Sequence, residues 1–481
     1  MLRWKVAVGL WLAGALGCGS GASAASNAAQ PSTPAEVAVA SVAADPQIAA
    51  AQASDAPSPS GTWVGAATAS DALVSGPQES FVAVWVDVPK QQAEAHAPAA
   101  VALSIDVSGS MAGDKIVRAR EAAARFVTQL RDGDIVSVHS FADSTREHVP
   151  PTRLDATSRA RIASVIAELS PQGGTNLFEG VRAAGLSAMS APPSHPVRRV
   201  VLISDGLATV GTTSREQLAN LGEKAGDRGV QVTAIGVGLD YDERTLNRLA
   251  QSSSGRLYHL ADARALPEIL QAELGLLTST RATNARVAIV PAPGVQVLGV
   301  DGARSVHRAG TLEVPLGAMF AGQHKEFVVR VRFTAPQEGK HPLASVRFVY
   351  DDPTEGNLER VQEAIARFEV VRDPSLARLN DRAQGVFAMV TAGLVTERAA
   401  QAIDADRFDE AERELAQVEQ RLRTQASAAK EKQRFEFSAE QVSSARKGAS
   451  AAAQAPAAAR PAAKRAVTLK ANDAALDMQG F

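Results

Sequence analysis

Apolar strands and amphipathic helices alternate along the chain between about residues 99 and 277. Stretches such as AAVALSID (99–106) and RRVVLIS (198–204) are continuous apolar runs bounded by polar loops, the pattern of strands buried on both faces. Segments between the runs, such as KIVRAREAAARFVTQL (115–130), place apolar residues at helical spacing. The alternation predicts an α/β domain over residues 99–278. Its sheet would be doubly wound, Rossmann-like and mostly parallel, with helices on both faces.

The hydrophobic pattern changes to a period of two between residues 279 and 372. In HKEFVVRVRFTAP (324–336), for example, apolar and polar positions alternate. Alternation of this kind is typical of antiparallel strands with one buried face, so we predict a β-sandwich-like domain here. The earlier stretch SFVAVWVDV (80–88) has strand character too. We therefore expect the strand region at 61–98 to pack with the later β region.

Helical spacing returns over residues 373–435, where one apolar stripe predicts a short helical hairpin. The stripe consists of Phe408, Ala411, Leu415, Val418 and Leu422. Residues 19–60 are rich in Ala, Ser and Pro, and much of 436–481 is Ala-rich and of low complexity. Such segments have little apolar surface with which to offset the entropy of ordering. We expect a disordered tether at 19–60 and a low-complexity tail at 436–481.

Residues 1–18 have the pattern of an export signal. Arg3 and Lys5 precede an apolar stretch that is shorter than the ~20 residues of a spanning helix. Cys18 is the sole cysteine, which excludes an internal disulfide. It follows Ala15–Gly17 in an arrangement that resembles a bacterial lipobox, whose cysteine is acylated. We expect a lipoprotein signal peptide, lipidation at Cys18 and an exported chain anchored by lipid in the bacterial cell envelope, on its periplasmic or cell-surface side. The alternative is an ordinary signal with an incidental cysteine.

The balance of basic and acidic residues argues against partners that are bound mainly through their negative charge. The chain of 481 residues has 50 basic and 52 acidic residues, a formal net charge of -2. A balanced charge gives no electrostatic footprint for nucleic acid or for an anionic membrane surface. We expect no nucleic-acid partner, membrane association through the lipid alone and no transmembrane helix in the mature chain, because no segment after Cys18 has an apolar run long enough to span a bilayer.

Oxygen-bearing side chains follow the ends of two predicted strands. Asp106 ends one apolar run and Asp205 ends another, so both carboxylates are expected at the same edge of a parallel sheet. Ser108 and Ser110 follow the first aspartate, and Thr175 lies after a Gly pair and before a helix. Two carboxylates and three hydroxyls form an all-oxygen set of the kind that hard divalent cations prefer.

The segments DVSGS, GGTN and SDG, in this order, resemble the metal-ion-dependent adhesion site (MIDAS) of von Willebrand factor type A domains. The resemblance covers about residues 99–277 and fills all five expected positions. It implies that Ser108, Ser110 and Thr175 bind the cation directly, and that Asp106 and Asp205 bind it directly or through water. The expected cation is Mg²⁺, with Ca²⁺ or Mn²⁺ as alternatives. With only two charged ligands, the ion keeps a position for an Asp or Glu of a protein partner.

The layout of an α/β domain, a β-rich region and short helices is similar to bacterial homologues of calcium-activated chloride channel proteins. We expect a non-enzymatic, cation-dependent protein-binding module. One alternative is an envelope scaffold in which the metal is only structural, and another is an accessory to a cytoplasmic ATPase, which the export signal disfavours. A phosphatase would carry a second acid at the position of Ser108. Asp240 and Asp242 are read as helix-capping acids, and His139 as a strand residue.

Overall fold

The computed structural model describes residues 61–479, except 74, 91–96, 239–240, 261, 309, 336, 374, 376–378 and 429–431. The expected signal peptide, the tether and Cys18 lie outside the described residues, as does Asp240. None of the helices in the described part of the chain combines the length and the hydropathy that crossing a bilayer requires.

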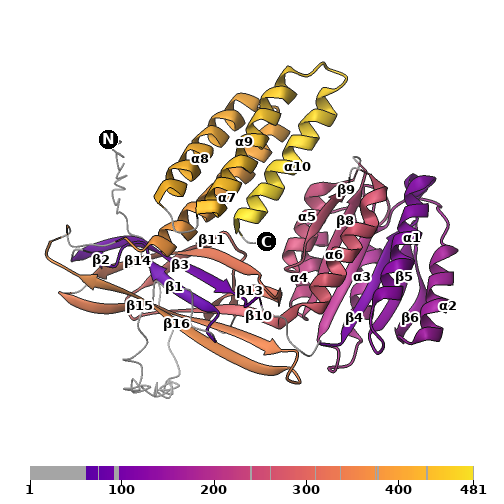
Figure 1. The fold of residues 1–481 in the computed structure, drawn as a ribbon, viewed down its shortest axis with the longest axis horizontal. Coiled ribbons are helices and arrows are strands. Elements are labelled where there is room, and N and C mark those ends of the chain that lie inside the picture. Colours follow the sequence, from indigo (N-terminus) through magenta and orange to yellow (C-terminus); the bar gives the residue numbers. More distant parts are fainter. Residues whose placement is uncertain are drawn as a thin grey trace, which may run out of the picture. The chain divides into compact units, whose positions relative to one another are not determined.

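The central part of the chain is an α/β domain with one six-stranded sheet (Figure 1). Its strands are β4 (Ala99–Asp106), β5 (Ile135–Phe141), β6 (Thr145–Arg153), β7 (Val197–Ser204), β8 (Val230–Val237) and β9 (Leu257–Leu260). The strand order is β6-β5-β4-β7-β8-β9, and every neighbouring pair is parallel except β5 and β6. The predicted Rossmann-like, mostly parallel sheet is confirmed.

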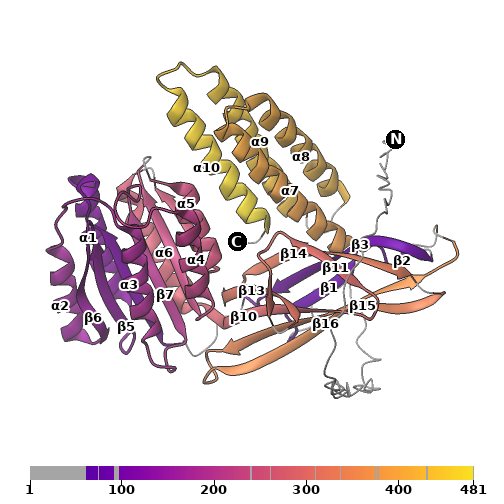
Figure 2. The same ribbon diagram turned by 180° about the vertical axis from the view of Figure 1, so that it is seen from behind.

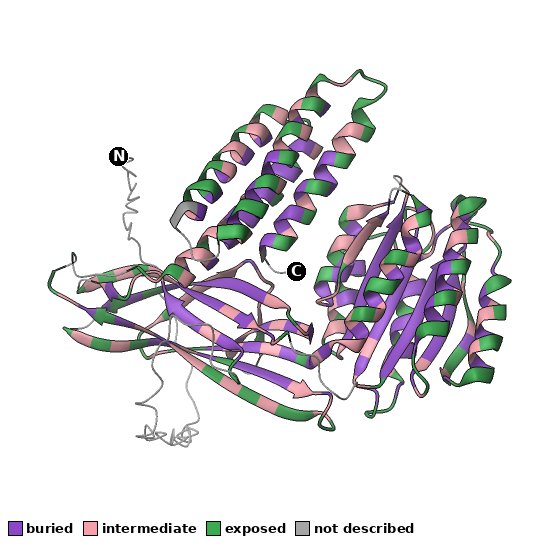
Figure 3. Cartoon of the chain, in the orientation of Figure 1, coloured by how far each residue is buried: buried purple, intermediate pink, exposed green. Residues whose placement is uncertain are grey.

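Helices cover both faces of this sheet. They are α1 (Asp114–Gln129), α2 (Ala156–Ala167), α3 (Leu177–Met189), α4 (Arg215–Gly226), α5 (Glu243–Ser252) and α6 (Leu266–Thr278). On β4, Val101, Leu103 and Ile105 join the apolar core under α1, α2 and α6, whereas Ala102 joins the core under α3, α4 and α5. The central strands are therefore buried on both sides (Figure 3), and the candidate residues Asp106 and Asp205 lie at the ends of β4 and β7.

Strand β6 was not predicted from the sequence. Residues 145–153 carry Pro150 and Pro151, which lack the N–H that a sheet ladder needs, so the stretch does not have the pattern of an interior strand. The strand pairs only with β5, at the edge of the sheet, where proline is tolerated. Its antiparallel direction is what makes the sheet mostly rather than wholly parallel.

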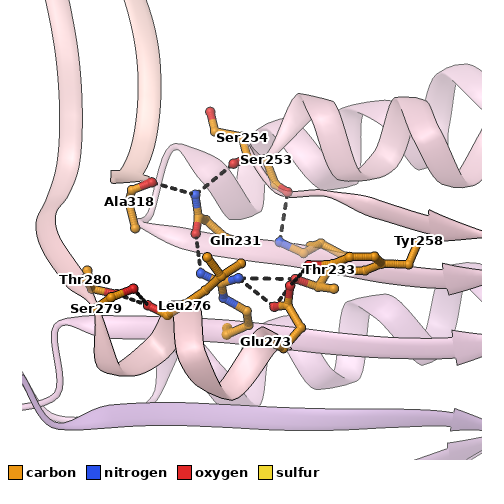
Figure 4. A network of polar contacts seen from close by, with 12 residues as sticks. Gln231, Thr233, Ser253, Ser254, Tyr258, Glu273, Leu276, Ser279, Thr280 and Ala318 are labelled. Carbon is orange, nitrogen blue, oxygen red and sulfur yellow. Dashed lines mark hydrogen bonds and ion pairs between the residues drawn. The ribbon is translucent and has the colours of Figure 1, made fainter. Parts of the chain in front are cut away.

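A buried polar network joins β7, β8, β9 and α6 inside the α/β domain (Figure 4). Arg199 Nη1 donates to Glu273 Oε2 at 2.7 Å, and both side chains are almost wholly shielded from solvent. Thr233 Oγ1 and Tyr258 Oη donate to the same carboxylate, each at 2.8 Å. Arg199 Nη2 donates to Gln231 Oε1 at 2.7 Å. Every carboxylate oxygen of Glu273 is thus paired, the condition under which a buried charge is tolerated.

The β-rich region consists of two sheets packed as a sandwich (Figure 2). One sheet has the order β1-β3-β14-β11, and the other β12-β13-β10-β15-β16-β2. The strands are β1 (Val64–Thr68), β2 (Ala72–Leu73), β3 (Gly76–Asp87), β10 (Thr280–Pro291), β11 (Gln296–Asp301), β12 (Val306–Arg308), β13 (Thr311–Phe320), β14 (His324–Ala335), β15 (Gly339–Asp352) and β16 (Leu358–Val370). Strand β3 pairs with β14 over its whole length. The α/β domain is therefore inserted between two strands of one sheet.

The C-terminal part contains four helices: the first two lie within the predicted hairpin at 373–435, and the last two replace most of the predicted tail. They are α7 (Asp381–Asp404), α8 (Phe408–Ala428), α9 (Lys432–Gln454) and α10 (Arg460–Gln479). The expectation of a low-complexity tail at 436–481 was wrong, because its alanines line a helix–helix core that includes Ala445, Ala449 and Ala471. Alanine is the strongest helix former, and its small side chain lets helices approach closely.

Two arginines of these helices converge on one carboxylate of the sandwich. Glu326 on β14 is buried, with no exposed side-chain surface. Arg434 of α9 donates to both of its oxygens, each at 2.8 Å, and Arg382 of α7 donates to Oε1 at 3.0 Å. Burial alone would raise the pKa of Glu326, but the hydrogen bonds and charges of the two arginines hold this pKa below its usual range. The cluster is a polar link between the sandwich and the helices.

Candidate functional site

The first predicted ligand, Asp106, is the last residue of β4 and is fully buried. Its Oδ1 accepts a hydrogen bond from the Ser108 N–H at 2.8 Å, and its Oδ2 accepts one from Ser204 Oγ at 2.6 Å. Burial raises the pKa of Asp106, and the nearby charge of Asp205 acts in the same direction. The environment therefore disfavours an uncompensated charge on this carboxylate, which a bound cation would compensate.

The two serines after Asp106 turn toward the second aspartate. A short 3-10 turn at Gly109–Met111 follows Ser108. The hydroxyls of Ser108 and Ser110 lie 3.0 Å apart, and Ser110 Oγ donates to Asp205 Oδ1 at 2.8 Å. This contact joins residues that are distant in sequence, so the edge of the sheet brings the two loops together as predicted.

Asp205 follows β7 and is also buried. Because β7 is parallel to and paired with β4, the ends of both strands reach the same edge. Its Oδ2 is paired with Lys115 Nζ at 2.5 Å. Lys115, in the first turn of α1, is thus a neighbour of the candidate site that the sequence analysis missed. Its place shortly after the serine loop, at the start of a helix, was the available signal.

The third loop brings Thr175 to the same place. The loop is held by hydrogen bonds from Gly109 N to Gly173 O at 3.0 Å and from the Thr175 N–H to Thr209 Oγ1 at 2.9 Å. A Cβ added to Gly206 would lie 3.4 Å from both Ser110 Oγ and Thr175 Oγ1. The two hydroxyls therefore lie beside the same stretch of backbone.

The five predicted residues come together at one sheet edge, and Asp242 has a structural role elsewhere in the domain. Asp242 is the N-cap of α5, where its side chain accepts from the Thr245 N–H. His139 is 1% exposed on β5. Ser204, which holds Asp106, is a second neighbour that the sequence reasoning missed, although it directly precedes Asp205. The described residues include no cluster of three or more His, Cys, Asp or Glu side chains arranged to hold a metal. Any cation at this edge would depend on hydroxyl ligands as well as carboxylates.

Comparison with known proteins identifies the central domain. The family profile described as von Willebrand factor type A domain matches residues 101–272. Relatives include the uncharacterized protein sll0103 of Synechocystis sp., 23% identical over 278 residues, and the uncharacterized protein YfbK of Escherichia coli, 25% identical over 192 residues. The matches cover 56% and 39% of this chain, but only 65% and 33% of the relatives. The chain thus spans less than two thirds of either relative.

Two solved structures resemble more of the chain. A von Willebrand factor type A protein from Catenulispora acidiphila has a TM-score of 0.65 at 18% identity, covering 80% of this chain and 91% of the other. The ArnB paralog VWA2 from Sulfolobus acidocaldarius has a TM-score of 0.58 at 18% identity, covering 86% and 97%. At this level of identity the likeness shows the fold and leaves function to the residues of this chain.

Proposed function

We propose that the von Willebrand factor type A domain of this chain, residues 101–272, is a non-enzymatic module that binds a protein partner through a divalent cation. The cation, Mg²⁺ first, would be held by the five residues at the sheet edge: Asp106, Ser108, Ser110, Thr175 and Asp205. Domains of this family are commonly protein-interaction modules. The cation would leave a position for an Asp or Glu of the partner.

The observation that carries this proposal is the convergence of oxygens from three separate loops. Two buried carboxylates and two linked hydroxyls face one another, and Thr175 Oγ1 reaches the same side of Gly206. The donor set fits a hard cation because every group is an oxygen. Lys115 compensates the charge of Asp205, but the hydrogen-bond donors to the buried Asp106 are neutral. A site that only capped turns would not need this second carboxylate, since its burial is costly without a compensating charge.

Other residues of the chain orient the two candidate carboxylates or neutralise part of their charge. Ser204 Oγ and the Ser108 N–H fix the orientation of Asp106, so that its carboxylate is held before any ligand arrives. Lys115 neutralises part of the charge of Asp205. A bound cation would supply Lewis acidity toward an incoming carboxylate, and the lysine would limit the total negative charge at the edge.

Titration of the full chain with Mg²⁺ by calorimetry tests the site. We expect saturable binding that Asp106→Ala and Asp205→Ala each weaken by more than about 100-fold, because each removes a charged ligand from a set of two. Thr175→Ala removes only a neutral ligand and should weaken binding by about tenfold. The matched control is Asp114→Ala, whose side chain is 64% exposed at the start of α1. Unchanged Mg²⁺ binding in the Asp106 and Asp205 variants would overturn the proposal.

A scaffold role, with the metal only structural, is the second candidate. It is favoured by an apolar groove of about 350 Å³ between α7 and α8, where Phe387 is 38% exposed. A groove of this kind could make contacts that need no cation.

Crosslinking capture from the membrane fraction discriminates the two roles and also tests the proposed export and lipid anchor at Cys18. We expect the chain in that fraction, and a captured partner that is lost with chelator and in Asp106→Ala. Retention of the partner in both cases would favour the scaffold. Recovery of the chain from the cytosolic fraction would contradict the anchor.

A further inference from the structure

A polar hollow of about 670 Å³ opens beside the candidate cation site, between β5, β6 and α3. Residues that line it include His139, Asp143, Thr145, Glu147, Glu179 and Ser187. It belongs to the same domain as the candidate site but uses none of the five predicted ligands.

Several buried polar atoms of this hollow lack a partner among the described residues. They are both ring nitrogens of His139, Thr145 Oγ1 and Ser187 Oγ. Burial, and then the charge of His148, lowers the pKa of His139 to about 4, so the ring is neutral near pH 7 and offers one donor and one acceptor. Buried polar groups without hydrogen bonds are unfavourable, so these atoms favour a polar occupant.

The charged residues that line the hollow favour an occupant with a positive charge. Glu179 is paired with Arg182, Nη2 to Oε2 at 2.7 Å. The exposed carboxylates of Asp143 and Glu147 have no ion pair within the described part of the chain. The hollow therefore has two unpaired carboxylates among its neutral polar lining residues, which favours a cation rich in N–H donors and disfavours an anion.

The hollow is continuous with the loop that carries Thr175. Asp143 Oδ1 accepts from the Gly174 N–H at 2.8 Å, and the Asn176 N–H donates to Ala142 O at 2.7 Å. Asn176 itself lines the hollow directly after Thr175. One partner segment that reaches the candidate cation site can therefore also reach the hollow.

We propose that this hollow receives a basic side chain, arginine or lysine, of the same protein partner that offers a carboxylate to the cation. The inference rests on the proposed function for the identity of that partner, and it adds a second, charge-selective contact. The carboxylates of Asp143 and Glu147 accept from the cationic group, and the neutral polar side chains of His139, Thr145 and Ser187 line the hollow around it.

A phage-displayed library of random peptides, selected on the full chain in Mg²⁺, tests the inference. We expect selected peptides to carry an acidic and a basic residue at a constant spacing. Synthetic copies of such a peptide should bind the double variant Asp143→Asn/Glu147→Gln about tenfold more weakly than the wild type, because two exposed charges are lost. Asparagine keeps the oxygen that accepts from Gly174, so the loop geometry is preserved. When the basic residue of the peptide is replaced by glutamine, the wild type and the double variant should bind the peptide with the same affinity.

The matched control is Glu121→Gln/Glu268→Gln, which makes the same charge change on exposed positions of α1 and α6. It should leave peptide affinity unchanged. Selected peptides without basic residues, or equal affinity for the wild type and the Asp143/Glu147 variant, would overturn the inference and leave the cation site standing. If the selected peptides bound without Mg²⁺ and carried no acidic residue, this result would instead overturn the proposed function.

Discussion

Replacing Glu273 with alanine is expected to lower the free energy of unfolding of the α/β domain by about 3–5 kcal/mol. The variant leaves the guanidinium of Arg199, which is 2% exposed, without its anionic partner. The hydroxyls of Thr233 and Tyr258 lose their shared acceptor as well (Figure 4). Hydrogen exchange localises the effect, since the amides of β7 and β8 should lose most protection.

The double variant Arg199→Met/Glu273→Leu should recover much of that loss, because apolar residues of similar volume need no counter-charge. The control is Glu268→Ala on the same helix, an exposed position whose charge contributes at most about 1 kcal/mol through the helix dipole. If Glu273→Ala and Glu268→Ala had the same small effect, the ion pair would not be a structural element of the domain.

Replacing Glu326 with glutamine is the second large change, and it should loosen the helices from the sandwich. The variant removes the charge that accepts from Arg382 and Arg434, and we expect a cost of about 3 kcal/mol. Hydrogen exchange should quicken in α7 and α9 while the α/β domain is unaffected. The control is Glu338→Gln, whose ion pair with Arg372 is exposed on both sides and should contribute less than about 1 kcal/mol.

The effect of Glu326→Gln also depends on pH with a defined sign. The pKa of Glu326 is held below its usual range in the folded chain, so the unfolded chain takes up the proton first as the pH falls. The carboxylate therefore stabilises the folded state fully at neutral pH. This stabilisation is lost as the pH falls from about 4.3 through the folded-state pKa. Stability curves of the wild type and the variant should converge in that acidic range, and parallel curves would contradict the assignment.

The arrangement of the candidate site could be predicted because it depends on strand ends. Asp106 and Asp205 each end an apolar run, and parallel pairing of β4 and β7 places such ends at one edge. The positions of Lys115 and Ser204 could not be predicted in this way. Their roles depend on side-chain directions across separate elements, which a linear pattern does not encode.

The last two helices, α9 and α10, were missed for a different physical reason. Their core relies on alanine and on close approach, as at Gly448, where a Cβ would lie 2.7 Å from Val467 Cγ2. Periodicity of large apolar residues is the primary sequence signal for a helix, and it is weak where the packing residues are small. An Ala-rich composition suggests disorder when it is considered alone, but in this chain the alanines let the helices pack closely.

The insertion of the α/β domain has a consequence for biosynthesis. Strand β3 finds its neighbour β14 only when the intervening domain has been made, since Asp87 pairs with His324 and Gly76 with Ala335. Such a long-range pairing is slow to form. Until β14 is available, the unpaired apolar strand β3 could pair with another copy of the chain. Autonomous folding of the inserted domain on the nascent chain would bring the segments before and after it close together. The sandwich would then form next to a domain that is already folded.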